Sequence, residues 1–390
     1  MGTVIFVMLP EPGHMNPSFK LAKTLQKRGH QVCYISIQDC EADIRAQGLS
    51  VIPIFEEMLP RGYQANLALN ASGDPTFKGD MSVKCLIDDQ MRIIYDHKSV
   101  ILDLVEKLGP DLFIVDNLLP AMVLVAHELG VPSIFLNVTF NGFDDYQGTK
   151  DLLPILKVPE LILCPQEFDM PNSQYGVRRR LYIEPSIDLD RKEPPFPWGL
   201  ISKDKPLIYC SLGTQSHFYK KESMHLYRCL IEAMAARDHW QLVLAIGSHL
   251  SVEQFRPTPS NVVVVNKAPQ LEMLKRAALM ITHGGLGSVK ECIFFEVPMV
   301  VLPLGRDQLR NAARVAYHSL GARGDIKNIS VDIIQSFIDK IDRNPSFKTG
   351  VKLMGGKFRE AENLERGVKI IEKLMGACER REVKKATCRL

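Results

Sequence analysis

The sequence predicts an α/β protein with two parallel-sheet domains in tandem. Short apolar runs alternate with helical patterns in both halves of the 390-residue chain. These runs are continuously apolar, which is typical of parallel strands covered on both faces by helices. A stretch at 184–199 that is rich in proline and charge separates the halves and has the composition of a linker. A chain of this length is too long for one ordinary core and fits two.

The first half repeats a strand–helix–strand pattern. It predicts strands at 3–9, 31–37, 111–117 and 132–138, and helices at 16–29 and 121–130. The first helix carries apolar residues at helical spacing and ends on Gly29. The initial apolar run is far shorter than the ~20 residues of a membrane span, and no basic segment precedes it. We therefore expect no obligatory membrane insertion.

The second half repeats the same rhythm after the linker. It predicts a helix at 220–236 and strands at 206–212, 240–246, 261–266, 279–283 and 298–304. Open parallel sheets bind ligands at the carboxyl ends of their strands. Two such domains are therefore expected to meet across a cleft that holds the ligands.

Charge and cysteine content exclude several classes of function. The net charge is only +3, and the basic clusters at 177–180 and 379–385 are short and lack interleaved aromatic residues. They indicate solvated faces, so we expect no nucleic-acid partner. The nine cysteines form no C-x-x-C pair and no His/Cys cluster at metal spacing. We expect small core residues of a reduced, cytoplasmic protein, with no disulfide and no metal site.

His14 is the first candidate catalytic residue. It lies in "MLPEPGHMNPS" (8–18), between the first strand and the first helix. A helix N-terminus disfavours added positive charge, so an imidazole there tends to stay neutral and can accept a proton. Asp116 ends a strand of the same half, where its carboxylate can orient a histidine and stabilise its protonated form. The alternative is a loop histidine that bonds only nearby backbone.

A glycine-rich turn in the second half is a candidate phosphate site. The segment "THGGLGSVKE" (282–291) follows a strand and opens a helix, so its backbone amides can approach a phosphate, and Ser288 adds a hydroxyl. Glu291 can accept hydrogen bonds from ribose hydroxyls, and "SLGT" (211–214) offers further amides and hydroxyls. A tight turn with helix capping is the alternative. The Walker pattern and the third glycine of the dinucleotide fingerprint are missing, which disfavours kinases and dehydrogenases.

Three further patterns have competing interpretations. Asp307 and Gln308 suit the hydroxyls of a sugar, although Asp307 alone could serve the dipole of the following helix. "HGGLG" is similar to the oxyanion segment of lipases, but the chain has no G-x-S-x-G. "DLD" (188–190) is similar to a D-x-D metal site, but its place in the linker favours a solvated charge pair.

Two irregular segments of the first half, 56–95 and 139–153, are candidates for a binding pocket, which the family resemblance described below implies is for the acceptor. Their large apolar residues predict an apolar or aromatic small molecule, with a lipid-like molecule as a further alternative. The same residues could instead cover the core. They are Met58, Leu59, Tyr63, Phe77, Met81, Phe140, Phe143 and Tyr146.

Together these patterns resemble a known family. "GHMNP" (13–17), "SLGT" (211–214) and the long stretch 267–313 are similar to the inverting nucleotide-sugar glycosyltransferases of family 1, the UDP-glycosyltransferase superfamily. The likeness is closer to the bacterial macrolide-glycosyltransferase-like branch and covers nearly the whole chain. It implies the GT-B fold, in which two Rossmann-like domains with parallel sheets face a central cleft.

The resemblance implies a division of the chain and a reaction. Residues 1–190 form the acceptor-binding domain, 191–204 the linker and 205–355 the nucleotide-sugar-binding domain. Residues 356–390 form a C-terminal helix that packs back on the first domain, and a basic tail. The implied reaction is the metal-independent, inverting transfer of a sugar from a UDP-sugar to a hydroxyl of the acceptor. It needs no cofactor besides this donor substrate, which we predict to be UDP-glucose; the oligomeric state is left open.

The family's roles carry over by position. His14 matches the general base and Asp116 the residue that orients it. The residues expected to bind the donor contact its base, ribose, diphosphate and sugar; they are Ser211, Gly213, Thr214, Lys267, Ala268, Gln270, His283, Gly285, Gly287, Ser288, Glu291, Asp307 and Gln308. Glu291 favours UDP over dTDP, because it suits a ribose with both hydroxyls, and Gln308 favours glucose.

Three residues depart from the family pattern. Lys267 stands where many plant members stack a tryptophan on uracil, Gly287 replaces an asparagine, and Glu296 replaces the glycine of a turn. They bear on donor affinity and nucleobase preference. Two alternatives in other classes are a nucleotide-sugar 2-epimerase and a catalytically silent nucleotide-sugar binding protein. The presence of both His14 and Asp116 disfavours each of them.

Overall fold

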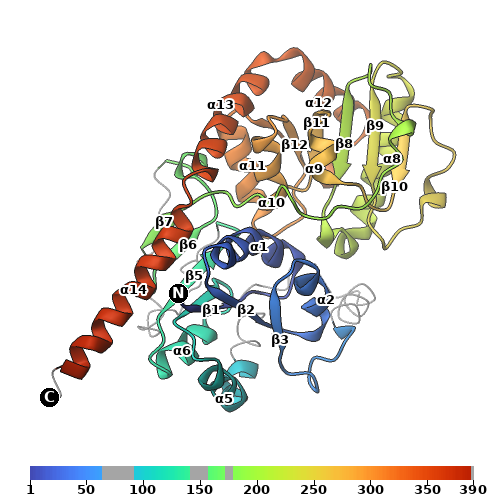
Figure 1. Cartoon of the computed structure of the whole chain (residues 1–390). Coiled ribbons are helices and arrows are strands. Elements are labelled where there is room, and N and C mark those ends of the chain that lie inside the picture. The colour runs from blue at the N-terminus through green and yellow to red at the C-terminus, as the bar shows by residue number, and fades with distance from the viewer. Residues whose placement is uncertain (64–91, 141–156, 172–178, 388–390) are drawn as a thin grey trace.

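The computed structural model describes residues 1–63, 92–140, 157–171 and 179–387. The molecule has two lobes, one above the other in Figure 1, and the linker runs between them. Each lobe is built on one parallel sheet with helices on both of its faces, so the predicted α/β class with two parallel sheets is confirmed.

The first sheet has seven strands in the order β3-β2-β1-β4-β5-β6-β7, and every adjacent pair is parallel. Among its central strands, β4 is buried throughout, and β1 and β5 are buried after their first residue, as their apolar sequences require. The strands are β1 (Thr3–Val7), β2 (Gln31–Ser36), β3 (Ser50–Pro53), β4 (Leu112–Asp116), β5 (Ser133–Asn137), β6 (Glu160–Ile162) and β7 (Arg180–Tyr182).

Four helices accompany this sheet in the described part of the first lobe. They are α1 (Pro12–Lys27), α2 (Gln38–Ala46), α5 (Lys98–Leu108) and α6 (Ala121–Glu128). Helix α1 begins four residues earlier than the predicted start at residue 16. Proline is favoured at the first helical position, because its missing N–H would be unsatisfied there in any case. Pro17 then costs the second turn only one hydrogen bond.

The second sheet has six parallel strands in the order β10-β9-β8-β11-β12-β13. They are β8 (Leu207–Ser211), β9 (Gln241–Ala245), β10 (Val262–Val265), β11 (Ala277–Thr282), β12 (Met299–Val301) and β13 (Gly321–Arg323). The helices of this lobe are α8 (Lys220–Ala235), α9 (Gln270–Leu274), α10 (Leu286–Phe294), α11 (Gln308–Tyr317), α12 (Val331–Arg343) and α13 (Pro345–Glu362). Short 3₁₀ turns are η3 (Gln166–Phe168), η4 (Trp198–Leu200), η5 (Thr214–Tyr219), η6 (Val252–Phe255) and η7 (Ile326–Asn328).

The last helix, α14 (Arg366–Thr387), leaves the second lobe and runs along the first (Figure 1). Its residues Val368, Ile371 and Met375 are buried in the core beside β1 and α1. Helix α14 thus ties the end of the chain to its beginning.

Two predictions from composition can be compared with the described residues. Within them, no helix is long and apolar enough to cross a membrane. The described cysteines carry no disulfide and most are buried. Burial raises the pKa of Cys40 to about 11, so this thiol stays protonated and packs as a small apolar group.

Candidate active site

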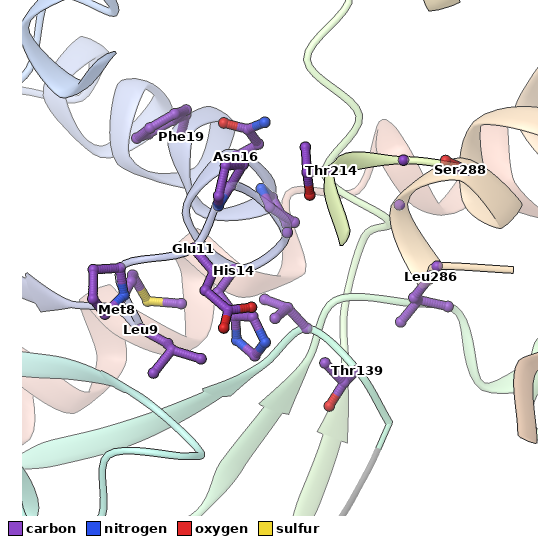
Figure 2. Close-up of a pocket in the computed structure, with 18 of the residues that line it drawn as sticks. Met8, Leu9, Glu11, His14, Asn16, Phe19, Thr139, Thr214, Leu286 and Ser288 are labelled. Atoms are coloured by element: carbon purple, nitrogen blue, oxygen red, sulfur yellow. The ribbon is translucent and has the colours of Figure 1, made fainter. Parts of the chain in front are cut away.

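A cavity of about 1400 Å³ lies where the carboxyl ends of the two sheets face each other. Residues of both lobes and of the linker line it. Figure 2 shows Glu11, the N-cap residue of α1, and His14, on the first turn of α1, across from Thr214, Leu286 and Ser288 of the second lobe. This is the location that parallel strand polarity dictates for a ligand. After the roles predicted from the sequence, we call the side formed by the first lobe the acceptor wall and the opposite side the donor wall.

His14 and Asp116 meet on the acceptor wall. The carboxylate Oδ2 of Asp116 lies 2.8 Å from Nδ1 of His14. Asp116 is fully buried and its oxygens also accept hydrogen bonds from the backbone N–H groups of Leu9 and Leu118. These three bonds fix the carboxylate, and the carboxylate fixes the imidazole with its proton on Nδ1. The nitrogen left for a ligand is Nε2.

The surroundings of His14 make it a stronger base. Burial by itself lowers the pKa of His14, but the charge of Asp116 and its hydrogen bond raise it, and Glu11 and Asp307 raise it further. The net result is a raised pKa. Asp307 comes from the donor wall, so both walls contribute to the basicity of one imidazole.

The donor wall contains the N-terminus of α10. The backbone N–H groups of residues 286–288 occupy the first turn, where α-helices provide no internal acceptor. Aligned peptide dipoles favour a negative ligand at this end. The arrangement can therefore bind a phosphate.

His283 lies beside this helix start as a buried, neutral side chain. Burial lowers its pKa to about 4. It can therefore donate a hydrogen bond to a phosphate near neutral pH, but it brings no positive charge.

Two glycines make room for the His283 ring. A Cβ on Gly213 would lie 2.5 Å from this ring and a Cβ on Gly285 would lie 2.6 Å from it. Gly213 also has a φ of +70°, which side chains rarely adopt. A Cβ on Gly287, by contrast, would meet nothing within 4 Å. Two of the three predicted glycines are therefore required by close packing, whereas Gly287 is not.

The structure brings the predicted ribose and phosphate residues together. The Nε2 of Gln270 lies 2.7 Å from Oε2 of Glu291 and 3.3 Å from Oγ of Ser288. An arginine that the sequence analysis missed completes this group. Arg191 of the linker forms a two-point ion pair with Glu291.

Asp307 and Gln308 lie together on the donor wall at the start of α11. The Oε1 of Gln308 accepts from the backbone N–H of Leu304 and of Gly305, so its amide N–H groups remain for a ligand. The Oδ2 of Asp307 accepts from Asn311 at 2.7 Å. Burial raises the pKa of Asp307, whereas Asn311 and His14 lower it, with a net upward shift. Asp307 also occupies the N-cap of α11 without a capping hydrogen bond, so the helix-dipole interpretation stays open beside the sugar one.

The other predicted donor residues also line the cavity. They are Ser211, Thr214, Lys267 and Ala268. Lys267 is exposed at the mouth and offers no aromatic surface for a nucleobase.

Glu296, which replaces a glycine, lies outside the cavity. Its φ is +60°, so the turn has the left-handed geometry that glycine adopts most easily. Its carboxylate pairs with Arg359, which also donates to the carbonyl of Phe294. This departure therefore affects a turn and not a donor contact.

Several contacts across the lobes were missed by the sequence analysis. Arg306 pairs with Glu11 at 2.8 Å across the mouth of the cavity. The buried ammonium of Lys290, on α10, donates to the carbonyls of Leu163 and Pro185. In a sequence, a basic residue in an apolar stretch is the only sign of such a contact. This sign does not show which residue is the partner.

The aspartate of "DLD" that faces the cavity, Asp188, is not a solvated charge. Asp188 forms an ion pair with Lys23 of α1 at 2.7 Å, so the prediction of a solvated charge pair is wrong for this residue. The linker packs on α1 here, so Asp188 has a charged partner on that helix.

The predicted acceptor residues divide into four groups. Met58 is exposed and does not line the cavity. Leu59 and Tyr63 line the cavity, together with Ile54, Phe55 and Met122. Phe140 is fully buried in the core, so the core-covering alternative holds for it. Four of the predicted residues lie outside the described part of the chain: Phe77, Met81, Phe143 and Tyr146.

Comparisons with known proteins agree with this geometry. The model of the UDP-glucoronosyl and UDP-glucosyl transferase family matches residues 246–381. The chain is 26% identical to NDP-glycosyltransferase YjiC of Bacillus subtilis (strain 168), over 95% of this chain and 97% of that protein. It is 25% identical to the zeaxanthin glucosyltransferase of Pantoea ananas, over 91% and 94%.

A solved structure shows the same fold. The spinosyn rhamnosyltransferase SpnG, complexed with thymidine diphosphate, superposes with a TM-score of 0.76 at 17% identity, over 95% of this chain and all of that one. With two facing parallel sheets, a family match over residues 246–381 and relatives along nearly the full length, the chain is a glycosyltransferase with the GT-B fold that uses a nucleotide-sugar donor, and it is similar to the UDP-glucoronosyl and UDP-glucosyl transferase family.

Proposed function

We propose that this enzyme transfers glucose from UDP-glucose to a hydroxyl of an apolar or aromatic small molecule, with inversion at the anomeric carbon. The observation that carries the proposal is the His14–Asp116 pair, which faces a donor wall across one cavity. A base on one wall and an anion-binding helix start on the other are the two groups that a direct displacement needs.

The proposed chemistry uses the nitrogen that Asp116 leaves unoccupied. The acceptor hydroxyl gives its proton to Nε2 of His14 as its oxygen bonds to the anomeric carbon. The bond from that carbon to the β-phosphate oxygen breaks, and the electron pair leaves with the nucleoside diphosphate. Asp116 stabilises the imidazolium that forms, because its charge lies 2.8 Å from Nδ1. Attack from the side opposite the leaving group gives inversion.

The donor wall supports binding of the nucleotide sugar without a metal in this scheme. The first-turn amides of α10 and the neutral His283 are placed to receive the negative charge of the leaving diphosphate. Glu291 is proposed to accept the ribose hydroxyls, which favours UDP over dTDP. Asp307 and the amide group of Gln308 are proposed to bind the hydroxyls of glucose.

The acceptor wall supports an apolar substrate. Ile54, Phe55, Leu59 and Met122 line the cavity on this side, and Tyr63 adds an aromatic ring at its edge. The name of the zeaxanthin glucosyltransferase describes an apolar acceptor for one relative. A cytoplasmic location, predicted from the cysteine content, stays a prediction.

Product analysis tests the proposal directly. Purified enzyme is given UDP-glucose and a panel of phenolic and polycyclic alcohols, with and without a chelator, and the glycoside is analysed by NMR. We expect a β-glucoside in both arms. An α-glucoside, or product only with added metal, would contradict the mechanism. UDP binding without transfer to any acceptor would support the silent binding protein, and a changed sugar configuration within the donor would support the epimerase.

A further inference from the structure

The linker places a cation on the carboxylate that is proposed to bind ribose. Arg191 follows the last strand of the first sheet by nine residues and reaches into the second lobe. Its Nη1 donates to Oε1 of Glu291, and its Nη2 lies 3.1 Å from Oε2. Both side chains are largely shielded, with 25% of Arg191 and 9% of Glu291 exposed. A two-point arginine–carboxylate pair is among the stronger polar contacts in proteins.

Arg191 is held in this position by a second carboxylate. Glu193 accepts from Nη2 of Arg191 at 3.0 Å. The same carboxylate accepts from the backbone N–H groups of Leu271 and Glu272, at the start of α9. The short segment 191–193 therefore lies across the donor wall with both ends fixed. We call it the linker strap.

The strap leaves Glu291 with little capacity for a ligand. A carboxylate has about four lone-pair positions. Arg191 uses one on each oxygen, and Gln270 uses another on Oε2 at 2.7 Å. About one position remains, on Oε1. A 2′-deoxyribose needs one acceptor for its 3′-hydroxyl, whereas a ribose needs two.

We propose that Arg191 is a specificity-determining residue that competes with the 2′-hydroxyl of the donor ribose for Glu291. A ribonucleotide must displace one arm of the guanidinium, but a 2′-deoxyribonucleotide need not. The strap therefore narrows the advantage of UDP over 2′-deoxy donors that Glu291 would give by itself. This inference rests on the ribose contact of Glu291 in the proposed function.

The test compares two ligands that differ only in the 2′-hydroxyl. Dissociation constants of UDP and of 2′-deoxy-UDP are measured by calorimetry for the wild type, Arg191→Ala, Arg191→Lys, Glu291→Gln and a control. The control is Arg28→Ala, because Arg28 also pairs with two carboxylates, Glu365 and Glu372, but lies outside the cavity. Circular dichroism checks that each variant is folded.

The expected result is a change in the ratio of the two constants. Arg191→Ala is expected to tighten UDP binding by about 5-fold and 2′-deoxy-UDP binding by less than about 2-fold, as a partly shielded ion pair is removed. Arg191→Lys keeps the charge but loses the two-point geometry, so its UDP affinity is expected to lie between those of the wild type and Arg191→Ala. Arg28→Ala is expected to match the wild type.

Other outcomes separate the two levels of the argument. Weaker UDP binding in Arg191→Ala would overturn the proposal and make Arg191 a direct nucleotide contact. Equal changes for both ligands, or none, would also overturn it. Glu291→Gln is expected to weaken UDP binding and bring the ratio toward one. If Glu291→Gln leaves UDP binding unchanged, the ribose contact itself is wrong, and the proposal for Arg191 falls with it.

Discussion

The two walls of the cavity are built in different ways. The anion site proposed for the donor wall comes from one continuous segment, 282–291, in which a strand, a glycine-rich turn and a helix start follow each other. The base proposed for the acceptor wall depends on two residues 102 positions apart, joined by a hydrogen bond between α1 and β4. Polar groups line much of the donor wall, whereas most lining residues of the acceptor wall are apolar, with Glu11, His14 and Asn16 among its polar ones.

This difference implies a division of labour between the walls. A local turn with backbone donors suits the part common to all donors, the diphosphate. Apolar loop residues around one base suit acceptors of varied shape. Changes on the acceptor wall should therefore alter the rate of transfer, and changes on the donor wall should alter nucleotide binding.

The largest expected effect is loss of the base. His14→Ala should lower kcat by about 10³-fold, because alanine has no group that can accept the proton of the acceptor hydroxyl. Asp116→Asn should be milder, at about 10- to 100-fold, because the imidazole remains but loses its charge partner. Steady-state kinetics measures both, and UDP titration serves as the control. Loss of UDP affinity in either variant would contradict the division between the walls.

The pH profile sharpens the role of Asp116. The base must be neutral to accept a proton, so kcat/KM should fall as the pH drops through the pKa of His14, which lies above 6.5. Asp116→Asn removes the negative charge that raises the pKa of His14, so the acid limb of the kcat/KM profile should move to lower pH. A raised folded-state pKa also means that this group stabilises the fold below pH 6.5, and that the stabilisation is lost as the pH rises through the folded value. An acid limb that stays in place would assign it to another group.

Three glycines of the donor wall form an internal comparison. Gly213→Ala and Gly285→Ala should each lower the free energy of unfolding by about 1–3 kcal/mol and weaken UDP binding by about 10-fold, because a new methyl displaces His283. Gly287→Ala should raise the free energy of unfolding by up to about 0.5–1 kcal/mol, because residue 287 is helical and a Cβ there would meet no other atom within 4 Å. Urea denaturation and UDP titration measure these effects. Destabilisation by Gly287→Ala would show that this backbone position needs glycine.

The smallest effect is expected at Glu296. The left-handed backbone of Glu296 costs about 1 kcal/mol, and replacement by glycine removes this strain. The replacement also removes a half-exposed ion pair with Arg359 that contributes about 0.5 kcal/mol. Glu296→Gly should therefore stabilise the protein slightly, by less than about 1 kcal/mol. Glu296→Ala keeps the strain and loses the ion pair, so it should destabilise. Opposite signs in urea denaturation would support this account, and equal signs would refute it.

Sequence reasoning predicted the parts of the fold that depend on local pattern. The long apolar strands match the structure closely, because burial on both faces leaves an uninterrupted apolar run. The three helices predicted with bounds correspond to α1, α6 and α8, although α1 begins four residues earlier than predicted. The strands β3, β6, β7 and β13 were not predicted. They have only three or four residues, and β7 consists of Arg180, Leu181 and Tyr182, so pairing with a neighbour and not composition defines it.

The site shows the same difference between features that follow from local sequence pattern and features that depend on contacts between distant segments. Chain order alone places these residues at a strand end or in the segment that follows one: His14, Asp116, the 282–291 turn, and the pair Asp307 and Gln308. These positions follow from chain order, because strand polarity sends every such end toward one edge of its sheet. Only the tertiary structure decided which charges meet, as Arg191 with Glu291 and Arg306 with Glu11. Such pairs depend on the relative placement of two lobes, and an ion pair between distant segments leaves no periodic signal in the chain.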